Sequence, residues 1–369
     1  EPPQGELETA LAQIWSELLQ VEPIGRRDHF FALGGHSLLV MRLIAMARER
    51  NLPPIEPGDL FLRPRLYDLA AHLVEVRPDA RDHAVCMRQG RSQPPLFLPH
   101  DGTGSLNYLH TLAAALPAGT PIYGLPSSAL DETPIPGVEA LASRMVGMIR
   151  DIQPEGPYRL AGWSTGGVIA YEIASQLLGV GEEVSFLGLF DAVYAAGLSA
   201  TAQAAFERAV DTFDEKSSLL QWMQTGEKFR TLDIARLRAL AAKLDQLTFA
   251  ELVRVGNEES LLPADLCHLS IEQLGQSLWR RHGYLKAQVR YRAARIPIPI
   301  HLFRAQDSAI KMPCLGWERV AGEARISVLH VPGDHHSMMI APNIGALADA
   351  LSSMLENPAD SNCDGNAHP

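Results

Sequence analysis

The chain has 369 residues, of which 46% are hydrophobic and 20% charged, and its formal net charge is −11. This length predicts two domains, and the composition is that of a folded globular protein, not of a disordered one. The acidic balance argues against nucleic acid as a partner, and no apolar stretch is long enough to span a membrane. The opening EPPQGELETAL has neither a methionine nor a signal-peptide pattern. We therefore expect a cytoplasmic segment of a longer polypeptide.

The four cysteines, Cys86, Cys267, Cys314 and Cys363, are scattered along the chain without C-x-x-C spacing. This pattern predicts reduced thiols, with no disulfide framework and no metal site. Reduced thiols agree with a cytoplasmic protein.

The first part of the chain has helical periodicity. Leu7, Leu11, Ile14 and Leu18 lie on one face of a predicted helix, a second helix is expected to begin at Ser37, and PRLYDLAAHLVEV supplies a third. Because no strand-like run precedes about residue 80, we predict a small all-α bundle over residues 1–76. The polar, Arg-rich and Pro-bearing stretch that follows predicts a linker over residues 77–90.

Beyond the linker, short apolar runs alternate with helical segments. The runs are PLFLPH, PIYGL, YRLAGW, VSFLGLFD, IPIHLFRA and ISVLHVPG. This alternation predicts an α/β domain over residues 91–355, with a parallel sheet covered on both faces. From about 195 to 295 the pattern is helical without strands, and an insertion of that length predicts a lid. The polar tail 356–369 is expected to be disordered.

The segment YRLAGWSTGGVIAYEIA places G-x-S-x-G between a predicted strand and a predicted helix. Gly162 and Gly166 remove side chains where a sharp turn would crowd the strand against the helix, so Ser164 is the candidate nucleophile. A serine hydroxyl is a weak nucleophile by itself, and it needs a histidine base that is oriented by an acid.

The α/β-hydrolase order of serine, acid and histidine is available in this chain. Asp191 ends the strand in FLGLFDA and is the favoured acid, while Asp307 follows a later strand and is the alternative. HVPGDHHSMM offers His335 and His336 as the base, and Asp334 fits a turn better than the acid position.

Two backbone N–H groups are expected to bind the oxyanion of the reaction. The loop FLPHDGTGS supplies the N–H of Asp101, and the residue after the nucleophile supplies that of Thr165.

A second serine follows two glycines in LGGHSLL, at residues 33–39. Ser37 could simply cap the helix that it begins. Alternatively it carries a phosphate-bearing arm, because the N–H groups and dipole at a helix N-terminus favour an anion. Gly34 and Gly35 would then let a modifying enzyme approach the serine closely.

Over about residues 5–75, DHFFALGGHSLLVMRLI with its flanking helices resembles the peptidyl carrier domains of non-ribosomal peptide synthetases. These domains are small four-helix bundles in which the serine of LGGHS bears 4′-phosphopantetheine. The resemblance implies that Ser37 carries this cofactor. His36 before the serine is more typical of a peptidyl carrier than of an acyl carrier of fatty acid or polyketide synthesis, where an aspartate is usual.

From about residue 84 to 355, PLFLPHDGTGS, YRLAGWSTGGVIAYEIA, LGLFDA and GDHHSMM resemble in their order the type I thioesterase domains that end such assembly lines. The resemblance implies an α/β-hydrolase domain with a helical lid, with Asp191 as the triad acid and His335 as the base. An aromatic residue often follows the nucleophile in this family, whereas Thr165 stands here, which bears on the shape of the pocket.

Together the two resemblances imply a terminal carrier–thioesterase didomain. It would accept a peptidyl thioester from phosphopantetheine on Ser37 onto Ser164 and release the peptide by hydrolysis or macrocyclisation. The implied partners are a phosphopantetheinyl transferase, the upstream condensation and adenylation domains of the same synthetase, and the peptidyl substrate. Nucleic acid and membrane are not expected. The alternatives are an esterase- or lipase-like hydrolase of free substrates with a helical docking module, an editing hydrolase, and a non-enzymatic binding module.

Overall fold

The computed structural model of the chain contains two compact units. It describes residues 1–35, 37–50, 52–53, 55, 59–60, 63–75, 83–90, 93–127, 135–211, 213–223, 246–259, 261–262, 269–308, 310–322 and 325–356. The first unit comprises Glu1–Ala80 with Ala264–Ser270, and the second comprises Arg81–Pro263 with Ile271–Pro369. Beyond residue 356, the tail that was expected to be disordered lies outside the described residues.

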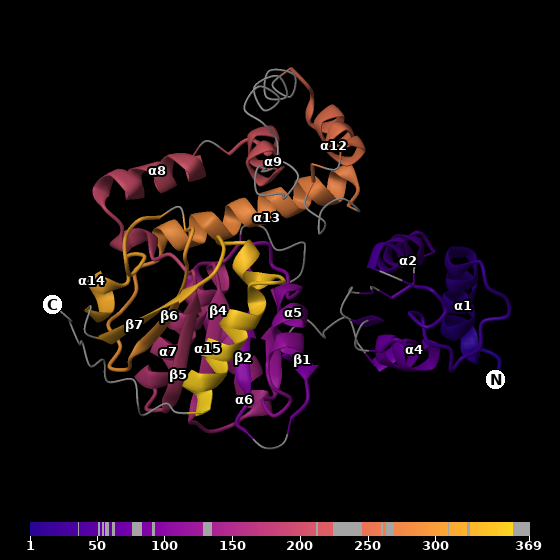
Figure 1. Ribbon diagram of the computed structural model, residues 1–369, viewed down its shortest axis with the longest axis horizontal. Coiled ribbons are helices and arrows are strands. Elements are labelled where there is room, and N and C mark those ends of the chain that lie inside the picture. The colour runs from indigo at the N-terminus through magenta and orange to yellow at the C-terminus, as the bar shows by residue number, and fades with distance from the viewer. Residues whose placement is uncertain are drawn as a thin grey trace. The chain divides into compact units, whose positions relative to one another are not determined.

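The first unit is helical, as predicted. Its described helices are α1 (Gly5–Leu19), α2 (Ser37–Glu49) and α4 (Leu66–Glu75) (Figure 1). Leu11 and Ile14 of the predicted apolar stripe are fully buried, and the ring of Trp15 packs edge-on against Phe30 with 5.1 Å between centroids. The helix at the second serine begins at Ser37, where the sequence predicts it.

The second unit is built on a seven-stranded sheet with the order β1-β3-β2-β4-β5-β6-β7. Its strands are β1 (Val85–Arg88), β2 (Leu96–Pro99), β3 (Ile122–Leu125), β4 (Tyr158–Trp163), β5 (Val184–Phe190), β6 (Ile300–Ala305) and β7 (Ile326–Val331). β1 pairs antiparallel with β3, and every other pair of neighbours is parallel. All six predicted apolar runs form strands.

β1 lies inside the segment 77–90 that was predicted as linker, so the sheet begins earlier than expected. It is a four-residue edge strand, VCMR, with only Met87 buried. An edge strand with one buried side chain has no continuous apolar run, and this removes the signal by which the inner strands are recognised.

Helices cover both faces of the sheet (Figure 1). α5 (Tyr108–Ala115) and α15 (Ile344–Glu356) share one buried core with strand residues, and α6 (Val138–Ile152) and α7 (Thr165–Gly179) share another. A short helix, α14 (Glu318–Ala321), precedes β7. Two covered faces explain why the inner strands are mostly apolar and do not alternate between apolar and polar residues.

The predicted insertion between β5 and β6 contains α8 (Ala200–Asp211), α9 (Glu215–Met223), α12 (Phe249–Glu258) and α13 (Ile271–Arg290), and its described residues contain no strand. α8 and α9 pack on α13, and α12 packs on α9 (Figure 1). α13 is itself tied to the sheet part of the unit, because the hydroxyl of its buried Tyr284 is hydrogen-bonded to that of Ser127. The insertion therefore has a fixed base, α13, with other helices resting on it.

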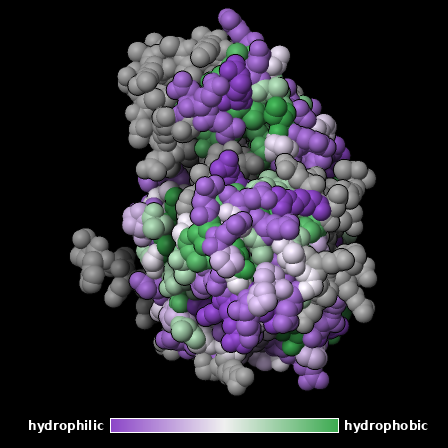
Figure 2. Space-filling model, turned by 90° about the vertical axis from the view of Figure 1, so that its right-hand side faces the viewer, coloured by the Kyte–Doolittle hydropathy of each residue, from purple (hydrophilic) through white to green (hydrophobic). Residues whose placement is uncertain are grey.

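No described helix combines the length and the apolarity needed to cross a bilayer. On the face shown in Figure 2, hydrophilic residues cover most of the described surface and hydrophobic residues form smaller patches between them. In the described part of the chain, Cys86 and Cys314 form no disulfide, and no three His, Cys, Asp or Glu side chains gather as a metal site. Cys267 and Cys363 lie outside it.

Candidate active site

Ser164 lies on a strained turn between β4 and α7. Its backbone has φ 55° and ψ −122°, a conformation that non-glycine residues rarely adopt. A Cβ at Gly162 would lie 2.3 Å from the backbone of Gly166, and one at Gly166 would lie 2.7 Å from the carbonyl oxygen of His100. Both glycines are therefore required for the chain to turn this tightly, and the turn places Ser164 at the carboxyl edge of the sheet.

The structure brings Ser164, His335 and Asp191 into one line of hydrogen bonds. The Ser164 hydroxyl donates to Nε2 of His335 over 3.1 Å, and Nδ1–H of His335 donates to Oδ2 of Asp191 over 2.8 Å. Asp191 is 2% exposed, and its second oxygen, Oδ1, accepts the N–H of Ala305. A carboxylate with both oxygens bonded holds the imidazole in the tautomer that leaves Nε2 free to accept a proton.

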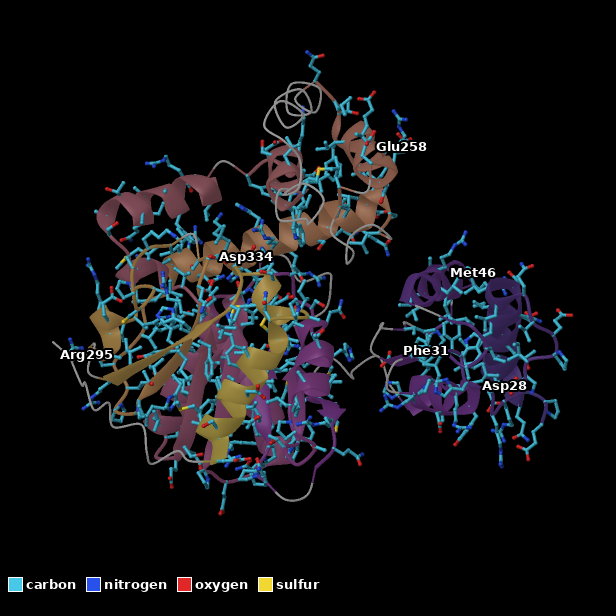
Figure 3. All side chains as sticks on the ribbon, in the orientation of Figure 1. Asp28, Phe31, Met46, Glu258, Arg295 and Asp334 are labelled. Carbon is cyan, nitrogen blue, oxygen red and sulfur yellow. The ribbon has the colours of Figure 1, made fainter. Side chains whose placement is uncertain are left out.

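The other carboxylates that the sequence offered, Asp307 and Asp334, have different surroundings. Asp307 is exposed, and its backbone N–H donates to the carbonyl of Gly333. Asp334, labelled in Figure 3, marks the loop after β7 that carries the histidines, and its Oδ1 accepts the N–H groups of His336 and Ser337. The carboxylate of Asp334 thus holds the turn, and of the two histidines it is His335 whose Nε2 accepts the hydrogen bond of the Ser164 hydroxyl.

Trp163, the residue before the nucleophile, contacts the histidine in two ways. Its Nε1–H donates to the carbonyl of His335 over 3.0 Å, and the centroids of the two rings are 5.3 Å apart with a 30° tilt. The sequence analysis did not single out this residue, although it stands inside the G-x-S-x-G motif.

The loop after β2 is organised by the carboxylate of Asp101. Its Oδ1 accepts hydrogen bonds from the N–H and hydroxyl of Thr103 and from the N–H of Ser105. The N–H of Asp101 donates to the carbonyl of Ser105, so this group, the predicted oxyanion donor, is engaged within the loop. Within the described part of the chain, the N–H of Gly102 donates no hydrogen bond, whereas the other N–H groups of residues 100–105 do.

Gly102 and Thr165 face each other across the site. A Cβ at Gly102 would lie 2.9 Å from Oγ1 of Thr165, so the loop passes directly against that side chain. Thr165 is the first residue of α7, where N–H groups lack intrahelical acceptors. The geometry thus favours Gly102 over Asp101 as the partner of Thr165, and both assignments stay predictions.

His100 is completely buried beneath this loop, with its ring 4.7 Å from that of Tyr284 and its Nδ1–H donating to the carbonyl of Asp101. Burial lowers the pKa of His100 from 6.5 to about 4, helped by the charges of Arg280 and Arg144. Burial also raises the pKa of the Asp101 carboxyl. This shift has the opposite effect on stability, because the folded chain holds that proton more tightly than the unfolded chain does. His100 is therefore neutral in the folded chain at neutral pH.

We expect His100 to make the second unit sensitive to mild acid. The unfolded chain binds a proton at this residue below about pH 6.5 and the folded chain only below about pH 4, so stability falls as the pH falls between them. From about pH 7 to about pH 5 the loss is about 2 kcal/mol. Calorimetry of the full chain should show His100→Asn losing less melting temperature over this range than wild type; equal losses would contradict the assignment.

Ser37 lies in the other unit, where the local backbone suits a phosphate ester. As the first residue of α2 it stands where N–H groups have no intrahelical acceptor, and the first turn of α2 has no acidic residue. Gly34 has φ +100°, and a Cβ at Gly35 would lie 2.3 Å from the ring of Phe30. The two glycines are thus needed by the fold itself, apart from any need of a modifying enzyme.

Comparison with known families divides the chain into two domains that correspond to the two compact units. A model of the thioesterase domain matches residues 94–354, and a model of the phosphopantetheine attachment site matches residues 9–73.

Among curated proteins, malpibaldin synthetase of Mortierella alpina is 39% identical over 197 residues, which cover 52% of this chain and 4% of that protein. A probable non-canonical nonribosomal peptide synthetase of Salinispora arenicola is 29% identical over 361 residues, which cover 96% of this chain and 4% of that protein. The chain therefore spans a small fraction of the length of these relatives.

Solved structures share the fold. A four-domain nonribosomal peptide synthetase bound to AMP and glycine aligns with 96% of this chain and 26% of its own, at a TM-score of 0.59 and 23% identity. The Vlm2 thioesterase domain with a bound dodecadepsipeptide aligns with 74% of this chain and 98% of its own, at a TM-score of 0.51 and 20% identity. The two matches agree with a helical domain followed by an α/β-hydrolase domain with inserted helices.

Proposed function

Because the chain belongs to the thioesterase domain family, and a phosphopantetheine attachment domain precedes the thioesterase domain, we propose that Ser37 and Ser164 act in sequence to release a peptide. Phosphopantetheine, when bound to Ser37, supplies the thiol to which the peptidyl chain is linked as a thioester. Ser164 then takes the peptide from that thioester. The line of hydrogen bonds from Asp191 through His335 to Ser164 is the observation that supports this proposal most directly.

In the first half-reaction, Nε2 of His335 accepts the proton of the Ser164 hydroxyl as Oγ bonds to the thioester carbonyl carbon. The N–H groups of Gly102 and Thr165 bind the oxyanion that forms. The carbon–sulfur bond then breaks, the imidazolium returns its proton to the leaving thiolate, and the peptide is held as an ester on Ser164. Asp191 keeps the imidazolium oriented and stabilises its charge throughout.

In the second half-reaction, His335 deprotonates the group that attacks the ester. Water yields a linear acid, whereas an amine or hydroxyl of the peptide yields a macrolactam or macrolactone. The same three residues serve both outcomes, so the proposal covers hydrolysis and macrocyclisation. The proposed partners are the upstream condensation and adenylation domains, consistent with the small share of the relatives' length that this chain spans, and a phosphopantetheinyl transferase.

Linking carrier and enzyme in one chain gives the substrate a high effective concentration, on the order of millimolar for a flexible linker. A transferase and peptidyl-coenzyme A should therefore load the full chain and be followed by release of the peptide. Ser37→Ala should neither gain the mass of the peptidyl-pantetheine nor release product.

Intact-protein and product mass spectrometry measures both events. A product one water lighter than the linear acid would identify cyclisation. Loading of Ser37→Ala equal to that of wild type would contradict the assignment of the attachment residue. Wild-type loading without release would contradict the proposed transfer to Ser164.

A further inference from the structure

The inserted helix α13 is hydrogen-bonded to the residue that follows the nucleophile. Nε2 of Gln288 donates to Oγ1 of Thr165 over 2.6 Å, although 123 residues separate the two in sequence. Thr165 is 3% exposed and Gln288 is half-buried. The contact joins the insertion to the first residue of α7, whose N–H is one of the two groups proposed to bind the oxyanion.

The side chain of Thr165 lies beside Gly102, the other proposed oxyanion donor. A Cβ added at Gly102 would be only 2.9 Å from the Thr165 hydroxyl oxygen. The loop also packs against α7 at Gly166, where an added Cβ would lie 2.7 Å from the carbonyl oxygen of His100. At residue 102, therefore, the Thr165 hydroxyl is the group against which the loop rests.

Gln288 lies near the end of α13, between two tyrosines whose hydroxyls are hydrogen-bonded to other elements. Four residues earlier, the hydroxyl of Tyr284 is bonded to Ser127, and three residues later that of Tyr291 donates to Oε2 of Glu172 over 2.7 Å. Tyr284 and Tyr291 are at most 1% exposed. These anchors tie the chain on either side of Gln288 to the segment after β3 and to α7.

We propose, building on the function proposed above, that Gln288 is a positioning residue for the oxyanion hole. It holds the Thr165 side chain in one rotamer and thereby keeps the N–H groups of Thr165 and Gly102 at the spacing that fits the tetrahedral oxyanion. Donors that are already in place lower the barrier because they need not reorganise as charge develops. The amide is neutral, so it orients Thr165 without adding a charge beside the oxyanion.

The test uses the full chain and octanoyl-N-acetylcysteamine as a thioester probe. Gln288→Ala and Thr165→Val each remove the hydrogen bond, and each should lower kcat about tenfold, less than the loss of an oxyanion donor itself, with little change in KM. The double variant should be no slower than either single variant, because both remove the same interaction. Thr165→Ser, which keeps the hydroxyl, should retain more activity than Thr165→Val.

The pH dependence separates this role from damage to the catalytic histidine. Among the described residues no hydrogen bond joins Gln288 to His335, so the midpoint of the kcat/KM profile should be the same in Gln288→Ala and wild type. Gln276→Ala is the matched control, because Gln276 is an exposed glutamine of the same helix whose amide donates to Glu272 and not to Thr165. It should leave kcat unchanged.

Wild-type kcat in Gln288→Ala, multiplying losses in the double variant, or an equal loss of kcat in Gln276→Ala would overturn the inference. Labelling of Ser164 by a fluorophosphonate distinguishes failure of this inference from failure of the proposed function. If the wild-type chain is not labelled, the proposed function fails and the inference fails with it. If wild type and Gln288→Ala are labelled at the same rate, the inference alone fails.

Discussion

Replacing Ser164 with alanine is expected to stop peptide release while leaving the loading of Ser37 intact. The change removes one oxygen atom, the acceptor of the peptide, and leaves the hydrogen bond between His335 and Asp191 in place. Serine nucleophiles of this kind account for a factor of about 10⁴ to 10⁶ in turnover, so release should slow by about that factor. Ser37 belongs to the other compact unit, and its modification does not depend on Ser164.

Intact-protein mass spectrometry after loading with peptidyl-coenzyme A would follow the release of the peptide. Wild type should return to the mass of the free pantetheine form, whereas Ser164→Ala should keep the peptidyl mass. Ser185→Ala is a suitable control, because Ser185 lies on β5 and its hydroxyl bonds to the carbonyl of Tyr158. Release by Ser164→Ala at the wild-type rate would refute the assignment of the nucleophile.

Asp191→Asn is expected to lower kcat by about 10³ to 10⁴. The amide has nearly the same shape as the carboxylate, but it has no charge to stabilise the imidazolium and accepts on one atom only. Because Oδ2 receives Nδ1–H of His335 and Oδ1 receives the N–H of Ala305, the amide nitrogen must oppose one of these two donors. The histidine then loses the orientation that leaves Nε2 free.

Asp307→Asn is the matched comparison, because the side chain of Asp307 is exposed and follows the next strand. Its kcat should stay within about twofold of wild type, as expected of a substitution on the surface, outside the line of hydrogen bonds at Ser164. Steady-state kinetics with the octanoyl thioester would measure both variants. A large loss in Asp307→Asn together with a small one in Asp191→Asn would transfer the role of the acid to Asp307.

Much of the fold was predictable because its signals are local. Six strands stand out as short, mostly apolar runs between helical segments, and the helix at Ser37 begins where the sequence predicts it. The edge strand at residues 85–88 was missed because a single buried side chain leaves no pattern to recognise.

The sequence by itself was enough to identify the two serines, their different surroundings and the candidates for the acid and the base. The tertiary structure favours Asp191 over Asp307 for a geometric reason: β5 pairs directly with β4, with Phe190 opposite Trp163, so Asp191 and Ser164 emerge from adjacent strand ends. Asp307 follows β6, one strand further away. The link between Gln288 and Thr165 had no local signal at all, because it depends on where an inserted helix is anchored, and that anchoring exists only once the chain has folded.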